Sequence, residues 1–181
     1  MPKRISVDIG SVTDIKKAIQ EIKAYQVWAD RRTREIADRL HLIGIHEASI
    51  RFSGAQYDGA NDVKLSSEEK VEDGRYIFTI NADGQAVCFI EFGAGVYYNS
   101  AQYPGEKPEG VVGIGEYGKG KGNQNYWAYY GEPGSNGWVV SGKKGREVVI
   151  THGNPAAMPM YYASSEMQQQ VLSIAKEVFG S

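Results

Sequence analysis

The chain has 181 residues, of which 41% are hydrophobic and 23% charged. This composition is typical of a globular protein, excludes wholesale disorder, and at this length predicts one domain spanning residues 1–181. Lys and Arg number 20 against 22 Asp and Glu, a net charge of −2, which argues against a dedicated nucleic-acid-binding protein.

The first half of the chain begins with a predicted short strand over residues 4–8, followed by a long helix over residues 11–42. Ser11 with Asp14 resembles a capping box at the start of this helix. Gly44 is expected to end the helix, and a break at residues 31–33 is a further possibility. Apolar residues recur every seven positions, which predicts a stripe that packs against a sheet: Ile15, Ile22, Ala29, Ile36 and Ile43.

Alternating apolar residues after the helix predict three strands. The first covers residues 48–52, and a polar loop over 56–72 separates it from the second, at 75–80. Asn81-Ala82-Asp83-Gly84 is predicted to form a hairpin turn that leads into a returning strand over 85–92. Cys88 lies in this last strand and is interpreted as a small core residue; as the only cysteine, it excludes a disulfide framework and a cysteine-based zinc site.

The end of the chain predicts a second hairpin and a helix. Residues 138–140 and 146–150 have the composition of strands, and Pro159 is suited to the first turn of a helix that Gly180 ends. The apolar face of this helix is expected to be Met160, Met167, Val171, Ile174 and Val178. The predicted fold class is therefore α+β, an antiparallel sheet packed against a long N-terminal helix and a C-terminal helix.

A long insertion rich in glycine and tyrosine, residues 96–137, interrupts this frame. The stretch Gly93–Gly145 holds 14 of the 22 glycines. Its charges nearly balance, so it lacks the positive groove of a single-strand nucleic-acid binder. Tyr and Trp are enriched at protein interfaces, and aromatic side chains also stack on sugars. Two interpretations follow: an interface loop, or a carbohydrate-binding module built on the cluster Tyr126–Tyr130.

The sequence contains no convincing catalytic, metal or cofactor site. Gly113–Lys119 resembles a phosphate-binding loop, but glycine and polar residues follow it where a helix would be needed. His41, His46 and His152 have no ligand spacing. We therefore expect no catalytic, metal-binding or cofactor-binding residues and no cofactor, so the chain is predicted not to be an enzyme. A small hydrolase that uses His152 and Glu91 is a weaker alternative.

Two blocks of sequence resemble a known family. Phe89-Ile90-Glu91-Phe92-Gly93-Ala94-Gly95 resembles the Glu-Phe-Gly-Thr/Ala-Gly signature of tail-component proteins from long-tailed bacteriophages, the tail-completion or head–tail joining proteins of the neck. The segment 151–163, Thr-His-Gly-Asn-Pro-Ala-Ala-Met-Pro-Met-Tyr-Tyr-Ala, resembles the second block of that family, which leads into its last helix. The order of long helix, hairpin, insertion and final helix is also similar.

The resemblance implies a structural virion protein without an active site. Such subunits assemble with themselves into rings, commonly hexamers, and join the tail tube to the head, so the implied partners are the tail tube or tail terminator protein and the head-completion or connector protein. The implied location is the virion neck, with host cytoplasm during assembly; DNA could pass through the ring lumen, without sequence-specific binding. The lack of a long apolar run predicts no membrane span, and the N-terminus lacks the apolar run of a signal peptide. The expected interface residues are Glu91, Phe92, Tyr97, Tyr98, Tyr103, Tyr117, Tyr126, Trp127, Tyr129 and Tyr130.

Overall fold

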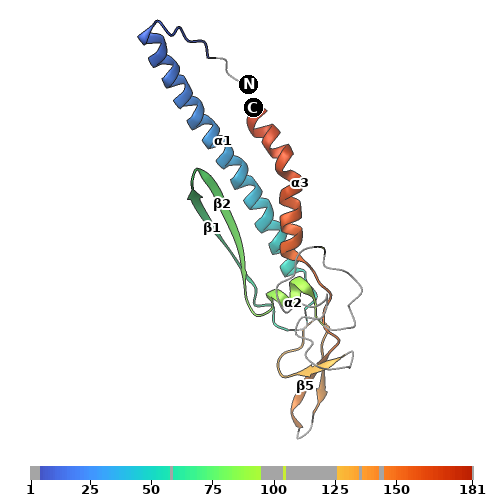
Figure 1. The fold of residues 1–181 in the computed structure, drawn as a ribbon. Coiled ribbons are helices and arrows are strands. Elements are labelled where there is room, and N and C mark those ends of the chain that lie inside the picture. The colour runs from blue at the N-terminus through green and yellow to red at the C-terminus, as the bar shows by residue number, and fades with distance from the viewer. Residues whose placement is uncertain are drawn as a thin grey trace.

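The molecule is elongated, with two long helices side by side at one end and a small sheet at the other (Figure 1). A computed structural model gives the fold, and the order of elements is α1, β1, β2, α2, β3, β4, β5, α3, so the α+β class is confirmed. The structure describes residues 5–57, 59–94, 104, 126–134, 136–142 and 145–180, apart from the side chain of Trp127.

Helix α1 spans Val12–Ser53, 42 residues, which corresponds to a rod of about 63 Å. The predicted cap is confirmed, because the Ser11 hydroxyl accepts a hydrogen bond from the Asp14 N–H at 3.3 Å. The helix continues through residues 31–33 without a break. Glu35 supports this stretch, since it pairs with Arg32 and with Arg39, each at 3.0 Å.

Three sequence expectations around α1 are wrong. Residues 5–8 form no strand. Gly44 does not end the helix, because it lies where Met167 of α3 and Ile80 of β2 pack closely against the backbone. The predicted strand 48–52 is the last part of α1, where Ala48 and Phe52, one turn apart, are buried in the core while Ile50 is exposed. Burial at positions i and i+4 follows the period of a helix.

Strands β1 (Lys64–Glu72) and β2 (Arg75–Asp83) form an antiparallel hairpin along α1. The turn is Asp73-Gly74, with φ of 50° and 73°, so the predicted turn at 81–84 is wrong. The predicted loop over 56–72 is wrong for residues 64–72, which form β1. Strand β1 is almost entirely exposed, and therefore its sequence lacks the alternation that marks a half-buried strand. The prediction for β2 is confirmed.

Helix α2 (Val87–Phe92) replaces the predicted returning strand. The Asp62 carboxylate accepts the N–H groups of Gln85 and Ala86, both at 2.9 Å, at the start of this helix. Ala86 and Ile90 lie four residues apart and are both buried, a spacing that a strand and a helix share. Cys88 is half-buried.

The second sheet is separate from the hairpin, in the order β3-β5-β4 with antiparallel pairing. Its strands are Trp127–Tyr129, Glu147–Thr151 and Trp138–Ser141. The predicted pairing of the last two is confirmed. Strand β3 lies inside the segment that was expected to be insertion.

Helix α3 (Pro159–Gly180) runs antiparallel to α1 and has the predicted bounds. Ala163, Ile174 and Val178 are buried, and Met160 and Met167 are half-buried, whereas Val171 is exposed. The central core joins Ala48 and Phe52 of α1 to Ala163 of α3, with Ala86 and Ile90 of the α2 segment beneath them.

Candidate functional site

The two blocks of the family resemblance meet in one place, which we call the junction (residues 89–94 and 151–161). Ala94 and Asn154 exchange backbone hydrogen bonds of 2.9 and 3.0 Å, and the Ala157 N–H donates to Ile90 at 2.9 Å. The buried Asn154 side chain donates to the Phe89 carbonyl at 2.8 Å. Segments about 60 residues apart in sequence are therefore joined by main-chain and side-chain hydrogen bonds.

Glu91 links α2 to the first turn of α3. Its two carboxylate oxygens accept the N–H groups of Met160, at 2.9 Å, and Tyr161, at 3.1 Å, and the residue is only 4% exposed. Free N–H groups and the helix dipole both favour a negative group at this position. Glu91 and the buried Phe92 thus act inside the subunit, where they orient α3; a direct contact of either with a neighbour stays a prediction.

Gly93 allows the chain to pass close to the second block. Its φ is 74° and its ψ is 168°, a region restricted almost entirely to glycine. A Cβ at this position would lie 2.7 Å from the backbone nitrogen of Ala156. Both the conformation and the close approach therefore require glycine in the signature.

Four of the nine aromatic residues in the predicted interface lie outside the described part of the chain. Tyr97, Tyr98, Tyr103 and Tyr117 lie outside the described residues, as does the glycine loop 113–119, and only the backbone of Trp127 is described, in β3. Their interface role stays a prediction.

The remaining aromatic residues lie on or beside the three-stranded sheet. Tyr130 is 72% exposed and Tyr126 is also exposed, whereas Tyr129 is half-buried. Tyr126 and Trp138 both pack against the ring of His152, with ring centroids 6.4 and 5.2 Å away. Trp138 was not among the predicted site residues, although it ends the aromatic run of the sequence, and His152 was named only for the hydrolase alternative. We call Tyr126, Tyr130, Trp138 and His152 the aromatic patch.

A second surface, which the sequence did not predict, is the N-terminal part of α1. Helix α3 ends beside Trp28, whose ring lies 5.7 Å from that of Phe179. Residues 12–27, which we call the overhang, extend beyond this contact (Figure 1). The apolar stripe was expected to pack against a sheet, but its first members, Ile15, Ile19 and Ile22, are exposed in the overhang, and so is Val12 beside them.

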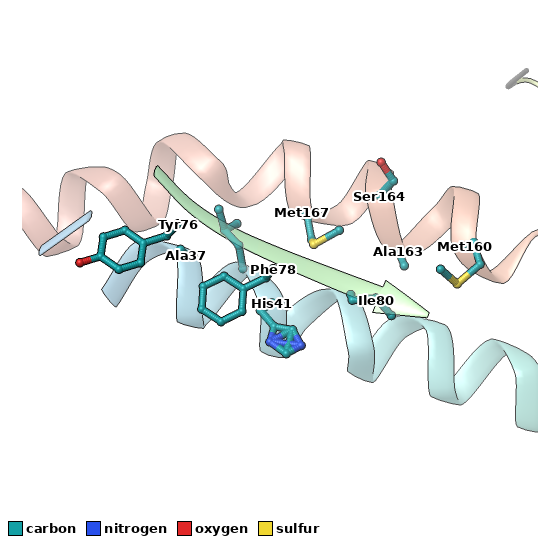
Figure 2. A pocket seen from close by; sticks show the side chains of 10 residues that line it. Ala37, His41, Tyr76, Phe78, Ile80, Met160, Ala163, Ser164 and Met167 are labelled. Carbon is teal, nitrogen blue, oxygen red and sulfur yellow. The ribbon is translucent and has the colours of Figure 1, made fainter. Parts of the chain in front are cut away.

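A groove of about 320 Å³ lies where α1, β2 and α3 come together (Figure 2). Its walls include Leu40, Phe78 and Met167, and the rings of His41 and Phe78 stack at 5.0 Å. The Nε2 atom of His41 is buried and has no hydrogen-bond partner among the described residues. Tyr76 and Ser164 add polar groups to a lining that is otherwise mostly apolar, and the side chains around the groove come from all three elements.

Among the described residues, two ionisable groups have displaced pKa values, and each connects one element to another. The backbone N–H groups of Gln85 and Ala86 lower the pKa of Asp62. The Tyr76 hydroxyl donates to the Asp30 carboxylate at 2.9 Å, and this hydrogen bond raises the pKa of Tyr76. Both groups serve the packing of the hairpin and α2.

Within the part of the chain that the structure describes, no group of three or more His, Cys, Asp or Glu side chains is arranged to hold a metal ion. None of the described helices is both long and apolar enough to cross a membrane. Comparison with known protein families, with curated proteins and with solved structures finds no match to this chain.

Proposed function

We propose that the chain is a structural protein of a phage or prophage virion, a tail-completion or head–tail connector subunit. It forms a ring with copies of itself in the neck and joins the tail tube to the head. The proposed partners are the tail tube or tail terminator protein on one side and a head-completion or connector protein on the other. In this proposal the subunit acts through its interfaces and not through catalysis.

The observation that carries the proposal is the junction. The two blocks that resemble the phage family are far apart in sequence, yet they bind each other through Glu91, Gly93 and Asn154. Residues that fit one another in this way support the interpretation of the two blocks as one signature.

Exposed apolar surfaces at the two ends of the molecule add to this support. The overhang and the aromatic patch lie at opposite ends of the elongated subunit. Large apolar side chains that gather on a surface mark sites of interaction. A ring subunit between two other layers needs contacts of this kind with its neighbours.

Deletion of the gene tests the proposal in the phage or prophage that encodes it. We expect separate heads and tails by negative-stain electron microscopy, and we expect purified chain to restore joined particles when it is added to the lysate. Joined, infectious particles in the absence of the chain would overturn the proposal. Neighbouring genes for portal, capsid and tail-tube proteins would support it.

The aromatic patch favours one alternative, a carbohydrate-binding module. Tyr126 and Trp138 flank one histidine ring, and both are exposed, as are the aromatic side chains that stack on sugars. Saturable binding on a glycan array that is lost in Trp138→Ala would favour this function. If the patch contacts protein only, Trp138→Ala should bind glycans no less than wild type does.

A further inference from the structure

We propose that a pocket beside the three-stranded sheet binds one aromatic ring that carries a hydrogen-bond donor, the chemistry of a phenol or an indole. The pocket has a volume of about 270 Å³ and lies between the loop after α1, helix α2 and strands β3 and β5. We call it the ring pocket, and its lining includes Tyr57, Phe89, Tyr129, Thr151 and Asn154. The inference goes beyond the proposed function and does not depend on it.

The ring pocket and the aromatic patch lie on opposite faces of the sheet. Tyr129 pairs with Val149, which is two residues from Thr151 on β5, so Tyr129 and Thr151 share a face. Trp138 of the patch pairs with Ile150, which points to the other face. The two aromatic sites are therefore separate, and each can be tested without the other.

Aromatic rings form the walls of the pocket. The rings of Tyr57 and Phe89 lie 6.0 Å apart at an angle of 35°, and Tyr129 adds a third ring from β3. All three residues are half-buried. Rings at such separations attract one another when they are offset or meet edge to face, so these walls suit a flat ligand. The volume is below the roughly 300–1,000 Å³ of pockets for drug-sized molecules and suits a single ring.

Asn154 supplies the pocket with a hydrogen-bond acceptor. The residue is 1% exposed, and its side-chain nitrogen donates to the carbonyls of Phe89 and Pro155, at 2.8 and 3.3 Å. These bonds fix the amide, and its oxygen Oδ1 accepts no hydrogen bond from the described part of the chain. Oδ1 is not among the described unpartnered atoms that are sealed from solvent, so it is reached from the pocket that Asn154 lines. A ligand N–H or O–H would satisfy this acceptor.

The small number of available polar groups selects a ring with one donor over a sugar. The Thr151 hydroxyl already accepts the Gly153 N–H at 2.7 Å, and the Tyr129 hydroxyl donates to the Glu132 carbonyl at 3.4 Å. A sugar would bring several hydroxyl groups between aromatic walls, and each one left unpaired would be unfavourable. A phenol or an indole brings a single donor and an apolar ring, which matches the pocket in size and polarity.

A pair of small ligands tests the donor. Para-cresol has the ring and hydroxyl of a tyrosine side chain, and in para-fluorotoluene a fluorine that cannot donate replaces the hydroxyl. In an NMR titration of the isotopically labelled full chain, we expect para-cresol to shift the amide signals of Ala94 and Thr151 saturably. It should bind at least about fivefold more tightly than para-fluorotoluene, because only para-cresol donates to Asn154. Equal affinities would overturn the role of Asn154, and no saturable binding of para-cresol would overturn the pocket.

A variant of one wall locates the binding site. Tyr129→Leu should weaken para-cresol binding at least about fivefold, because it removes one of the three rings. The variant should keep the circular dichroism of wild type, since β3 is at the edge of its sheet. The matched control is Tyr25→Leu, the same change at a tyrosine of the overhang that is 46% exposed, and it should bind like wild type. Unchanged binding by Tyr129→Leu, or equal losses in both variants, would overturn the assignment to this pocket.

Two sources carry this chemistry, a tyrosine or tryptophan side chain of a partner protein and a free aromatic molecule. N-acetyl-tyrosinamide distinguishes them, because it presents the phenol ring between two amide groups, as a polypeptide does. Affinity equal to that of para-cresol or higher would support a side chain. Binding of para-cresol alone would support a free molecule and overturn the side chain as the source.

Discussion

Gly93 and Gly74 have nearly the same φ, 74° and 73°, but very different surroundings. Gly74 lies in the exposed turn of the hairpin, where an added Cβ would meet nothing within 4 Å. At Gly93 the added Cβ would lie 2.7 Å from a backbone nitrogen of the other block. The pair separates the effect of backbone conformation from the effect of close packing.

We expect Gly93→Ala to lower the free energy of unfolding by about 3 kcal/mol or more, and Gly74→Ala by about 1 kcal/mol, since only the first adds a clash with the backbone to the strain. Urea unfolding followed by circular dichroism measures both. Equal losses in the two variants would show that the junction tolerates an extra carbon at Gly93.

The Asp62 carboxylate produces a pH dependence with a defined sign. Its pKa is lowered in the folded chain by the N–H groups of Gln85 and Ala86. The stabilisation is therefore fully present above the unfolded pKa, about 3.9, and is lost as the pH falls through the lower folded pKa. We expect Asp62→Asn to be less stable than wild type at pH 7 and the difference to shrink in strong acid. A difference in unfolding free energy that stays constant with pH would contradict this role.

At the scale of elements, α3 is held to the frame by one face. Ile174 is 7% exposed on that face, and Leu172, two residues away, is 70% exposed on the other. We expect Ile174→Asp to lower the free energy of unfolding by about 4 kcal/mol, because it buries an unpaired charge. Leu172→Asp should change it by no more than about 0.5 kcal/mol, and thermal or urea unfolding of the pair measures the contrast. Comparable losses would mean that both faces of α3 are packed.

Helix α1 divides into two parts with different support. Residues 36–52 contact α3, the hairpin or the core, whereas most of the overhang has no such cover. An isolated helical segment of this length is marginal in water. The overhang is helical because it continues without a break into the packed part of α1.

At the scale of the whole molecule, this difference predicts uneven amide exchange. At a concentration where the chain is monomeric, amides of residues 12–27 should exchange faster than those of 36–52, because opening the overhang exposes little buried surface. Hydrogen exchange read by mass spectrometry checks the prediction. Uniform protection along α1 in the monomer would contradict it.

The sequence by itself determined the features that depend on neighbouring residues. Ser11 and Pro159 mark helix starts through local backbone chemistry, and β2 alternates because its two faces differ in burial. Strands β4 and β5 were indicated by their composition. The sequence also showed the motif Glu91-Phe92-Gly93-Ala94 as one block and residues 151–163 as a second block related to it. From these signals the α+β class and most of helix α3 could be predicted.

Tertiary structure alone decided the rest. Gly44 stays inside α1 because Met167 and Ile80 pack on it. Residues 87–92 form a helix because Asp62, more than 20 positions earlier, accepts the N–H groups of Gln85 and Ala86 immediately before it. The burial of Glu91 and the exposure of Ile19 likewise depend on where α3 begins and ends. Local sequence pattern cannot predict these outcomes. Apolar periodicity predicts that one face of a helix packs against a partner, but only the folded chain determines how far along the helix that partner extends.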